Sequence, residues 1–257
     1  MLTDDATGTL QMLYTASGHD DGGIDPDDPL QRLAHTTGQI HADDQGVWFT
    51  GFEDHQIVAE ADGSLYQTQE QSESGPIIYA FRDPPFLFRD PTDGRTYALF
   101  EGNNAGVAGT HRCDRKEIGR VPPGHVVPED ARFYTGNIGL MELTPGDSTY
   151  TDWTLLPPLL SAECTNQQTE RPHLVVHEGG RYYLWTISHT FTFAPGLTGP
   201  DGLYGFVGDG LRSDYRPLNG SALVLGNPPE EAPLQNYSDY VMPNLLVESF
   251  IDTVPTA

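Results

Sequence analysis

The sequence predicts an all-β protein. Short apolar or alternating runs recur along the whole chain, and turn-forming pairs such as Asp-Gly and Gly-Gly separate them. Helical periodicity sustained over about 11 residues is hard to find. The composition agrees with this interpretation, because 28 glycines and 21 prolines imply many turns.

The expected strands are the runs between these turns. They are 9–16 (TLQMLYTA), 46–52, 76–81, 85–88, 96–102, 173–176, 182–188, 203–208 and 222–226. Segment 242–254 (MPNLLVESFIDTV) is ambiguous, and its Val, Phe and Ile content favours a strand. The stretch from about Gly102 to Leu160 is expected to be rich in loops. No break in composition marks a linker, so residues 1–257 are interpreted as one domain.

The charge balance is strongly acidic. Thirteen Lys and Arg residues stand against 37 Asp and Glu, which gives a net charge of -24, and Lys116 is the only lysine. Nucleic acid and anionic membranes are excluded as partners because both would repel such a chain. Apolar residues at 37% and aromatic residues at 10% are too many for a disordered polymer. The composition is typical of a folded halophilic protein, whose self-repulsion high salt screens.

Neither a metal site nor a cofactor is predicted. Cys113 and Cys164 form no CxxC motif, so a zinc or redox motif is not indicated. His173 and His177 could share a strand face, but no third ligand is near them in the sequence. No apolar run approaches the roughly 20 residues of a membrane span, and the first residues do not resemble a signal peptide.

Two segments share one pattern. Residues 82–102 (RDPPFLFRDPTDGRTYALFEG) and 170–189 (ERPHLVVHEGGRYYLWTISH) both begin with a charged pair and a proline. An apolar strand, a Gly-containing turn, an arginine and an aromatic strand follow in each. Similar hairpins favour a sheet-repeat architecture such as a β-propeller, with a β-sandwich as the alternative. In a propeller Asp83 would face the central funnel and not the core.

Asp83 and Glu170 are therefore the candidate catalytic groups. Convergent carboxyl groups suit glycoside chemistry, in which one protonates the leaving oxygen and another attacks the anomeric carbon. The acid needs a raised pKa, which burial or a like-charged neighbour provides. The alternative is that both are ordinary surface charges at strand ends, and the shared hairpin pattern argues against it.

At these residues the chain resembles glycoside hydrolase family 68, which contains levansucrases, inulosucrases and related β-fructofuranosidases. FRDPPFLF resembles the RDP motif of the family, and TERPHLVV resembles its acid/base motif. YALFEGNNAG, GNIGLMEL, residues 188–228 and YSDYVMPNLLVESFIDTV extend the resemblance over nearly the whole chain. The invertase family also carries RDP, but its acid/base lies in an ECP motif, so ERP favours family 68.

The resemblance implies a five-bladed β-propeller with a funnel-shaped sucrose site. Asp83 matches the transition-state stabiliser, and Glu170 matches the general acid/base that protonates the glucosyl oxygen. Further matched positions are expected to bind substrate: Arg82, Glu101, Gln168, Arg171, His189 and Tyr237. For Gln168, His189 and Tyr237, ordinary polar residues near a rim are the alternative interpretation.

One departure from the family pattern concerns the nucleophile. The family carries it as the Asp of a Trp-Asp motif ahead of RDP, and a WSGSA-type segment supplies a substrate-binding serine. Neither occurs here, and none of Trp48, Trp153 and Trp185 precedes an aspartate. We therefore expect a truncated propeller that lacks the first blade and the last strands and is inactive alone. A degenerate carbohydrate-binding propeller and an invertase-type hydrolase are the alternatives.

The resemblance also implies an extracellular protein that acts on sucrose, with fructan or sugar acceptors as further partners. Extracellular conditions permit disulfides. Cys113 and Cys164 flank the strands of Asp83 and Glu170 and bracket the long loop region, so a disulfide is predicted between them, with two free thiols as the alternative.

Overall fold

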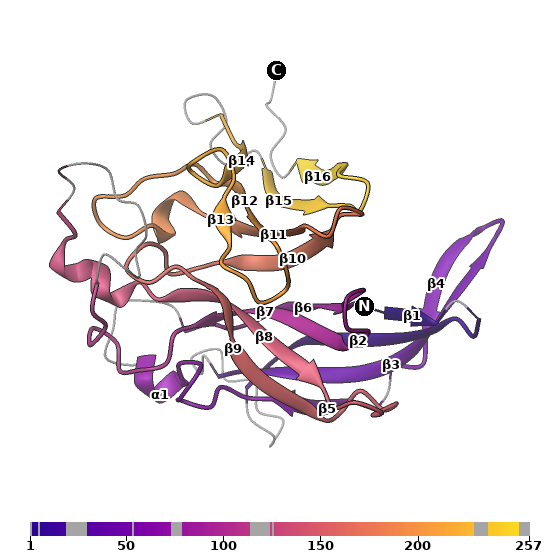
Figure 1. Ribbon diagram of the computed structural model, residues 1–257. Coiled ribbons are helices and arrows are strands. Elements are labelled where there is room, and N and C mark those ends of the chain that lie inside the picture. The colour runs from indigo at the N-terminus through magenta and orange to yellow at the C-terminus, as the bar shows by residue number, and fades with distance from the viewer. Residues whose placement is uncertain are drawn as a thin grey trace.

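The structure, a computed structural model, describes residues 2–4, 6–18, 30–52, 54–72, 79–113, 124, 126–228 and 236–251. These residues form antiparallel sheets, which confirms the all-β prediction (Figure 1). Helix is confined to α1 (Gln69–Ser72) and the 3-10 turns η1 (Glu129–Phe133) and η2 (Thr190–Thr192) in the part described. No helix in those ranges is long and apolar enough to cross a membrane.

The first sheet is built around one long strand, β3. Its strands are β1 (Leu2–Asp4), β2 (Thr9–Ser17), β3 (Gln31–Asp43), β4 (Gly46–Thr50) and β5 (Gln56–Ala59). The N-terminal half of β3 pairs with β5, as in the pair Ala34–Ile57, and the C-terminal half pairs with β4, as in the pair His41–Trp48. The hairpin of β3 and β4 consequently projects from the body of the molecule (Figure 1).

The second sheet is an antiparallel meander. Its order follows the chain: β6 (Phe81–Arg89), β7 (Thr96–Asn103), β8 (Gly136–Leu143) and β9 (Trp153–Ser161). Strands β8 and β9 lie within the stretch expected to be rich in loops, so that expectation was wrong for these residues. Strand β9 contains Pro157 and Pro158, which lack an N–H to donate, and it tolerates them because it is the edge strand of this sheet.

The third sheet repeats the meander and the fourth is a hairpin. The third contains β10 (Glu170–Val176), β11 (Tyr182–Ser188), β12 (Gly202–Gly208), β13 (Arg216–Pro217) and β14 (Leu223–Gly226). The fourth pairs β15 (Asn236–Val241) with β16 (Val247–Ile251). The ambiguous segment at 242–254 is thus a turn followed by a strand over its described residues.

The apolar core lies between successive sheets. One cluster joins the first sheet to the second and includes Leu33, Phe81 and Phe100, each fully buried. Another joins the second sheet to the third and includes Leu140 and Leu184. The packing brings β6 next to both β2 and β10, the early strands of the neighbouring sheets. The start of β6 therefore lies beside the start of β10, where the predicted catalytic residues are.

Candidate active site

Strands β6 and β10 begin with the same backbone irregularity. Pairing between β6 and β7 shifts register after Arg82, and pairing between β10 and β11 shifts after Glu170. The next residue in each strand has a positive φ, 65° at Asp83 and 47° at Arg171. Non-glycine residues rarely adopt this conformation, and it concentrates at functional sites. The repeat recognised in the sequence is thus a repeated bulge that turns these residues out of the ladder.

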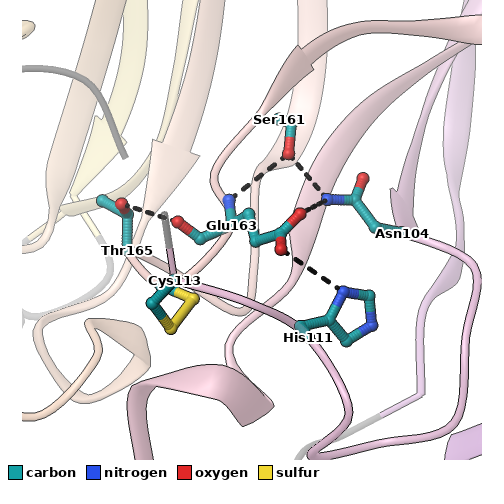
Figure 2. Close-up of a disulfide and its surroundings, with 7 residues drawn as sticks. Asn104, His111, Cys113, Ser161, Glu163 and Thr165 are labelled. Carbon is teal, nitrogen blue, oxygen red and sulfur yellow. Dashed lines mark hydrogen bonds and ion pairs between the residues drawn. A yellow bond between two sulfur atoms is a disulfide. The ribbon is translucent and has the colours of Figure 1, made fainter. Parts of the chain in front are cut away.

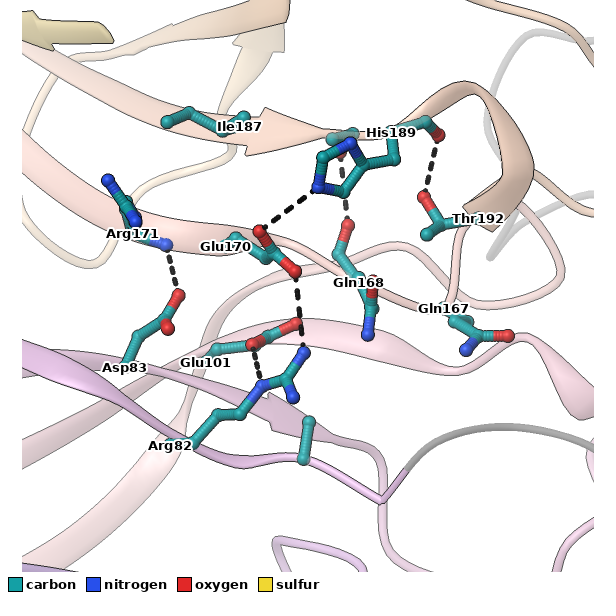
Figure 3. A network of polar contacts seen from close by, with 12 residues as sticks. Arg82, Asp83, Glu101, Gln167, Gln168, Glu170, Arg171, Ile187, His189 and Thr192 are labelled. Atoms are coloured by element: carbon teal, nitrogen blue, oxygen red, sulfur yellow. Dashed lines mark hydrogen bonds and ion pairs between the residues drawn. The ribbon is translucent and has the colours of Figure 1, made fainter. Parts of the chain in front are cut away.

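The two bulges are joined by a hydrogen bond. The main-chain N–H of Arg171 donates to Oδ2 of Asp83 at 2.5 Å (Figure 3). Burial raises the pKa of the Asp83 carboxyl; the Arg171 N–H works against this shift, the negative charge of Glu170 adds to it, and the net direction is upward. The hydrogen bond therefore fixes the orientation of the Asp83 carboxyl group, and Glu170 is close enough for its charge to affect the pKa of that group.

Arg82 holds the other two carboxyl groups of the site. Its Nε donates to Oε2 of Glu101 at 2.8 Å, and its Nη2 lies 3.4 Å from Oε1 of Glu170. Glu101 is the register partner of Arg82 on β7 and is 0% exposed. Burial raises the pKa of Glu101 to about 8, although Arg82 opposes the shift. The site thus pairs one arginine with carboxyl groups from adjacent sheets.

Gln168 completes the contacts around Arg82. Hydrogen-bonding partners decide which way a side-chain amide points. With its oxygen toward Arg82, Gln168 accepts from Nη2 at 2.7 Å and its nitrogen donates to Oε1 of Glu170 at 3.3 Å. Two hydroxyl groups of β11 hold the main chain of residues 168–170 in place. Ser188 donates to the carbonyl of Gln168 and Thr186 to that of Glu170.

His173 supports the Arg171 bulge from the next residue but one. Its Nδ1 donates to the Arg171 carbonyl at 3.0 Å, and its Nε2 accepts from the Val241 N–H of β15 at 2.9 Å. Burial lowers the pKa of His173 to about 4, so the ring is neutral at pH 7. Nε2 thus links β15 to β10, and Nδ1 holds the main chain of the bulge within β10. Over the described ranges no group of three or more His, Cys, Asp or Glu is placed to hold a metal ion.

His189 and Asp201 lie on the other side of Glu170. Nε2 of His189 is 3.6 Å from Oε2 of Glu170 (Figure 3), and Nδ1 of His189 is 2.9 Å from Oδ2 of Asp201. His189 follows β11 and Asp201 precedes β12, so the turn between these strands brings them together. Asp201 was not among the predicted site residues. Its Asp-Gly sequence reads as an ordinary turn signal, although it lies in the segment that carries the family resemblance.

The predicted site residues whose side chains the structure describes lie close together. The structure gathers Arg82, Asp83, Glu101, Gln168, Glu170, Arg171 and His189 at the starts of β6 and β10 and the ends of β7 and β11 (Figure 3). Arg171 contributes its main chain to Asp83. Tyr237 belongs to β15, but its side chain lies outside the described residues.

A disulfide joins the loop after β7 to the segment that precedes β10. Cys113 is bonded to Cys164, with their Cα atoms 5.6 Å apart. Close to the bond, Asn104 donates to Ser161 and Glu163, and Nδ1 of His111 is 3.6 Å from Glu163 (Figure 2). The disulfide and these contacts tie the loop after β7 to the segment that leads into Gln168 and Glu170.

Antiparallel sheets that present buried carboxyl groups and an arginine from adjacent hairpins define a scaffold suited to glycoside chemistry. The chain belongs to glycoside hydrolase family 68, because the Levansucrase/Invertase family model matches residues 1–257.

Individual relatives agree with this assignment. Levansucrase LscB of Pseudomonas savastanoi pv. glycinea is 52% identical over 229 residues, which is 89% of this chain and 51% of that protein. The levansucrase of Gluconacetobacter diazotrophicus is 44% identical over 273 residues, 96% of this chain and 45% of that protein. The chain spans about half the length of the curated relatives it matches.

Solved structures are similar as well. An inulosucrase from Halalkalicoccus jeotgali bound to kestose matches with a TM-score of 0.77 and 46% identity, over 92% of this chain and 53% of that one. The levansucrase of Gluconacetobacter diazotrophicus matches with a TM-score of 0.82 and 43% identity, over 96% and 54%. Both neighbours agree with the assignment to family 68, and the inulosucrase match supports the halophilic interpretation of the sequence.

Proposed function

We propose that this chain carries part of the active site of a levansucrase-type fructosyltransferase. The reaction splits sucrose by retaining double displacement and passes fructose to fructan, another sugar or water. The observation that carries the proposal is the joining of Asp83 to Arg171 and of Arg82 to Glu170, which brings both motifs of the family to one site. The buried carboxyl groups of Glu101 and Glu170 and their contacts with Arg82 favour an enzyme over a degenerate binding propeller.

The roles follow from the surroundings of each group. Glu170 would protonate the glucosyl oxygen and later take the proton of the acceptor hydroxyl. Asp83, fixed by the Arg171 N–H, would hold fructosyl hydroxyls in the transition state. Arg82, which already holds Glu101 and Glu170, would fix the sugar and balance the negative charge of the carboxyl groups.

We propose that the sheets are blades of a five-bladed β-propeller. Each is an antiparallel unit that follows the previous one in the chain, and β6 lies between β2 and β10, as the early strands of blades do around an axis. The sequence contains no Trp-Asp motif, so the nucleophile would come from residues outside this chain. Residues 1–257 would then be inactive alone and part of one catalytic domain.

An extracellular location fits the proposal. The Cys113–Cys164 disulfide is of a kind that persists in oxidising surroundings. Sucrose and fructan would be partners there, and the kestose bound to the structural neighbour is a sugar of the class expected for the acceptor side.

A chimera tests the function. The parts of Pseudomonas savastanoi LscB on either side of its matched region would be joined to the two ends of this chain, and the chimera would be assayed in molar salt for glucose release from sucrose. We expect release by the chimera, loss of about two or more orders of magnitude in Glu170→Gln and Asp83→Asn, and parental rates in the exposed control Glu178→Gln. A folded chimera without activity would count against the proposal.

A further inference from the structure

His189 lies between two acidic side chains, one on each ring nitrogen. Nδ1 is 2.9 Å from Oδ2 of Asp201, and Nε2 is 3.6 Å from Oε2 of Glu170. The side chains of Asp201 and Glu170 are each 7% exposed, and that of His189 is 14% exposed. The imidazole ring also stacks on Phe191 with centroids 5.0 Å apart. The ring is thus held in one plane with each nitrogen directed at a different carboxyl group.

Asp201 accepts hydrogen bonds at both oxygens. Oδ1 receives the Thr190 N–H at 2.6 Å, and Oδ2 faces Nδ1 of His189. Burial alone would raise the pKa of Asp201, but the hydrogen bonds from Thr190 and His189 overcome it, and the net direction is downward. An ionised carboxylate can only accept. Nδ1 of His189 must therefore carry a proton whenever this contact exists.

This arrangement determines what Nε2 can do. In the neutral ring Nε2 is a bare acceptor, and it can bind Glu170 only when the Glu170 carboxyl carries the proton. If Glu170 is ionised, the same contact requires an imidazolium ring. In the first case the proton lies on Oε2 of Glu170 and in the second on Nε2 of His189; at 3.6 Å the two atoms are neighbours but are not hydrogen-bonded in this structure.

We propose that Asp201 is a positioning residue that holds His189 in the Nδ1–H tautomer, so that the bare Nε2 faces the Glu170 carboxyl group and exchanges a proton with it during the reaction. The meaning of this contact for catalysis rests on the proposed function, because Glu170 must hold a proton before the glucosyl oxygen leaves. The tautomer itself is a property of the chain without substrate.

The variant Asp201→Asn reverses the hydrogen-bonding demand. The Thr190 N–H would keep the Asn oxygen in place, so the amide NH₂ would face Nδ1 and donate to it. His189 should then move its proton to Nε2, the opposite tautomer. Asp201→Glu, which restores an acceptor, should return the parental tautomer, and Asp209→Asn, an exposed change just after β12, should leave it unchanged.

Long-range ¹H–¹⁵N correlation spectra of ¹⁵N-histidine-labelled residues 1–257 in molar salt distinguish these states, because a bare imidazole nitrogen resonates far downfield of a protonated one. His189→Gln identifies the signal, and the spectrum is taken at a pH where the ring is neutral. We expect Nδ1–H in the parent and in Glu170→Gln, and Nε2–H in Asp201→Asn. An Nε2–H ring in the parent, or a folded Asp201→Asn variant with the parental tautomer, would overturn the proposal.

A second readout uses the chimera. Asp201→Asn should lower kcat/KM for sucrose by at least about tenfold, a part of the 10²–10⁴ that a general acid contributes. It should leave kcat/KM for fructosyl fluoride within about twofold, because this parameter reports the departure of fluoride, which needs no proton donor. Equal losses on both substrates would contradict the proposal. The tautomer experiment is decided without sucrose, so an inactive chimera would count against the proposed function alone.

Discussion

The carboxylate of Asp83 accepts a hydrogen bond from the main-chain N–H of Arg171, a residue 88 positions further along the chain. Both residues have a positive φ, and each lies at a register shift near the start of its strand, β6 for Asp83 and β10 for Arg171. Two strained bulges are thus held against each other. Backbone strain of this kind persists where the surroundings over-determine it, and here it directs Asp83 and Glu170 toward one site.

Two replacements of Asp83 should distinguish the contribution of its hydrogen bond to stability from that of its charge. Asn can still accept from the Arg171 N–H and tolerates a positive φ, whereas Ala leaves the N–H without this acceptor and is strained there. We expect Asp83→Ala to be less stable than Asp83→Asn by about 2 kcal/mol in urea unfolding at constant salt. Equal unfolding free energies would show that the bond between the bulges does not stabilise the fold.

Glu101 should make stability depend on pH. Its pKa is raised to about 8 from an ordinary 4.5, so the folded state binds the proton more tightly than the unfolded state does. The contribution is fully present below pH 4.5 and is lost as pH rises through 8, with a slope of up to about 1.4 kcal/mol per pH unit.

Glu101→Gln removes this titration. The variant should gain stability relative to the parent as pH rises from 4.5 to 8, whereas Glu178→Gln, an exposed change on the β10–β11 turn, should follow the parent curve. Unfolding free energies measured across this range test the expectation. A constant difference between Glu101→Gln and the parent would mean that Glu101 is ionised throughout.

Much of the site could be predicted from the sequence, for identifiable reasons. The RDP and ERP segments share a local pattern, and the pattern places Asp83 and Glu170 at equivalent points of two hairpins. The bulges themselves could not be predicted, because a positive φ is rare at non-glycine residues and the hydrogen bond between Asp83 and Arg171 joins segments that are far apart in the sequence. Asp201 was missed because its contact with His189 depends on how the turn after β11 folds back, which no local periodicity encodes.

Part of the fold was also predictable from the sequence. Alternating apolar runs predicted strands such as β2, β7 and β11 but not the long β3. Strand β9 was missed because Pro157 and Pro158 suggest a loop, and only its position at the edge of the sheet makes prolines acceptable. Which sheets lie next to one another depends on core contacts between distant residues such as Leu140 and Leu184.

Removal of the disulfide should lower stability substantially. The bond joins residues 51 positions apart, and the loop-entropy relation gives about 4 kcal/mol for a loop of that length. The double variant Cys113→Ser/Cys164→Ser should lose about this amount in equilibrium unfolding. Addition of a reductant should lower the parent similarly and leave the variant unchanged. A parent that is insensitive to the reductant would contradict the expectation.

Folding should require salt. At a net charge of -24 the chain repels itself, and the Debye length grows from about 3 Å at 1 M to about 30 Å at 0.01 M. Far-ultraviolet circular dichroism should show loss of strand signal as salt falls from molar to about 10 mM. An osmolyte at the same low ionic strength is the control for general stabilisation. Unchanged spectra over this range would show that other interactions offset the repulsion.

The role of Glu170 as general acid is tested most directly by changing the leaving group of the substrate. Parent and Glu170→Gln chimeras would be compared on sucrose, whose glucosyl oxygen needs a proton, and on fructosyl fluoride, which departs without one. If Glu170 is the general acid, the variant loses about 10²-fold or more in kcat/KM on sucrose and far less on the fluoride. Equal losses on the two substrates would contradict the assignment and with it the proposed role of the site.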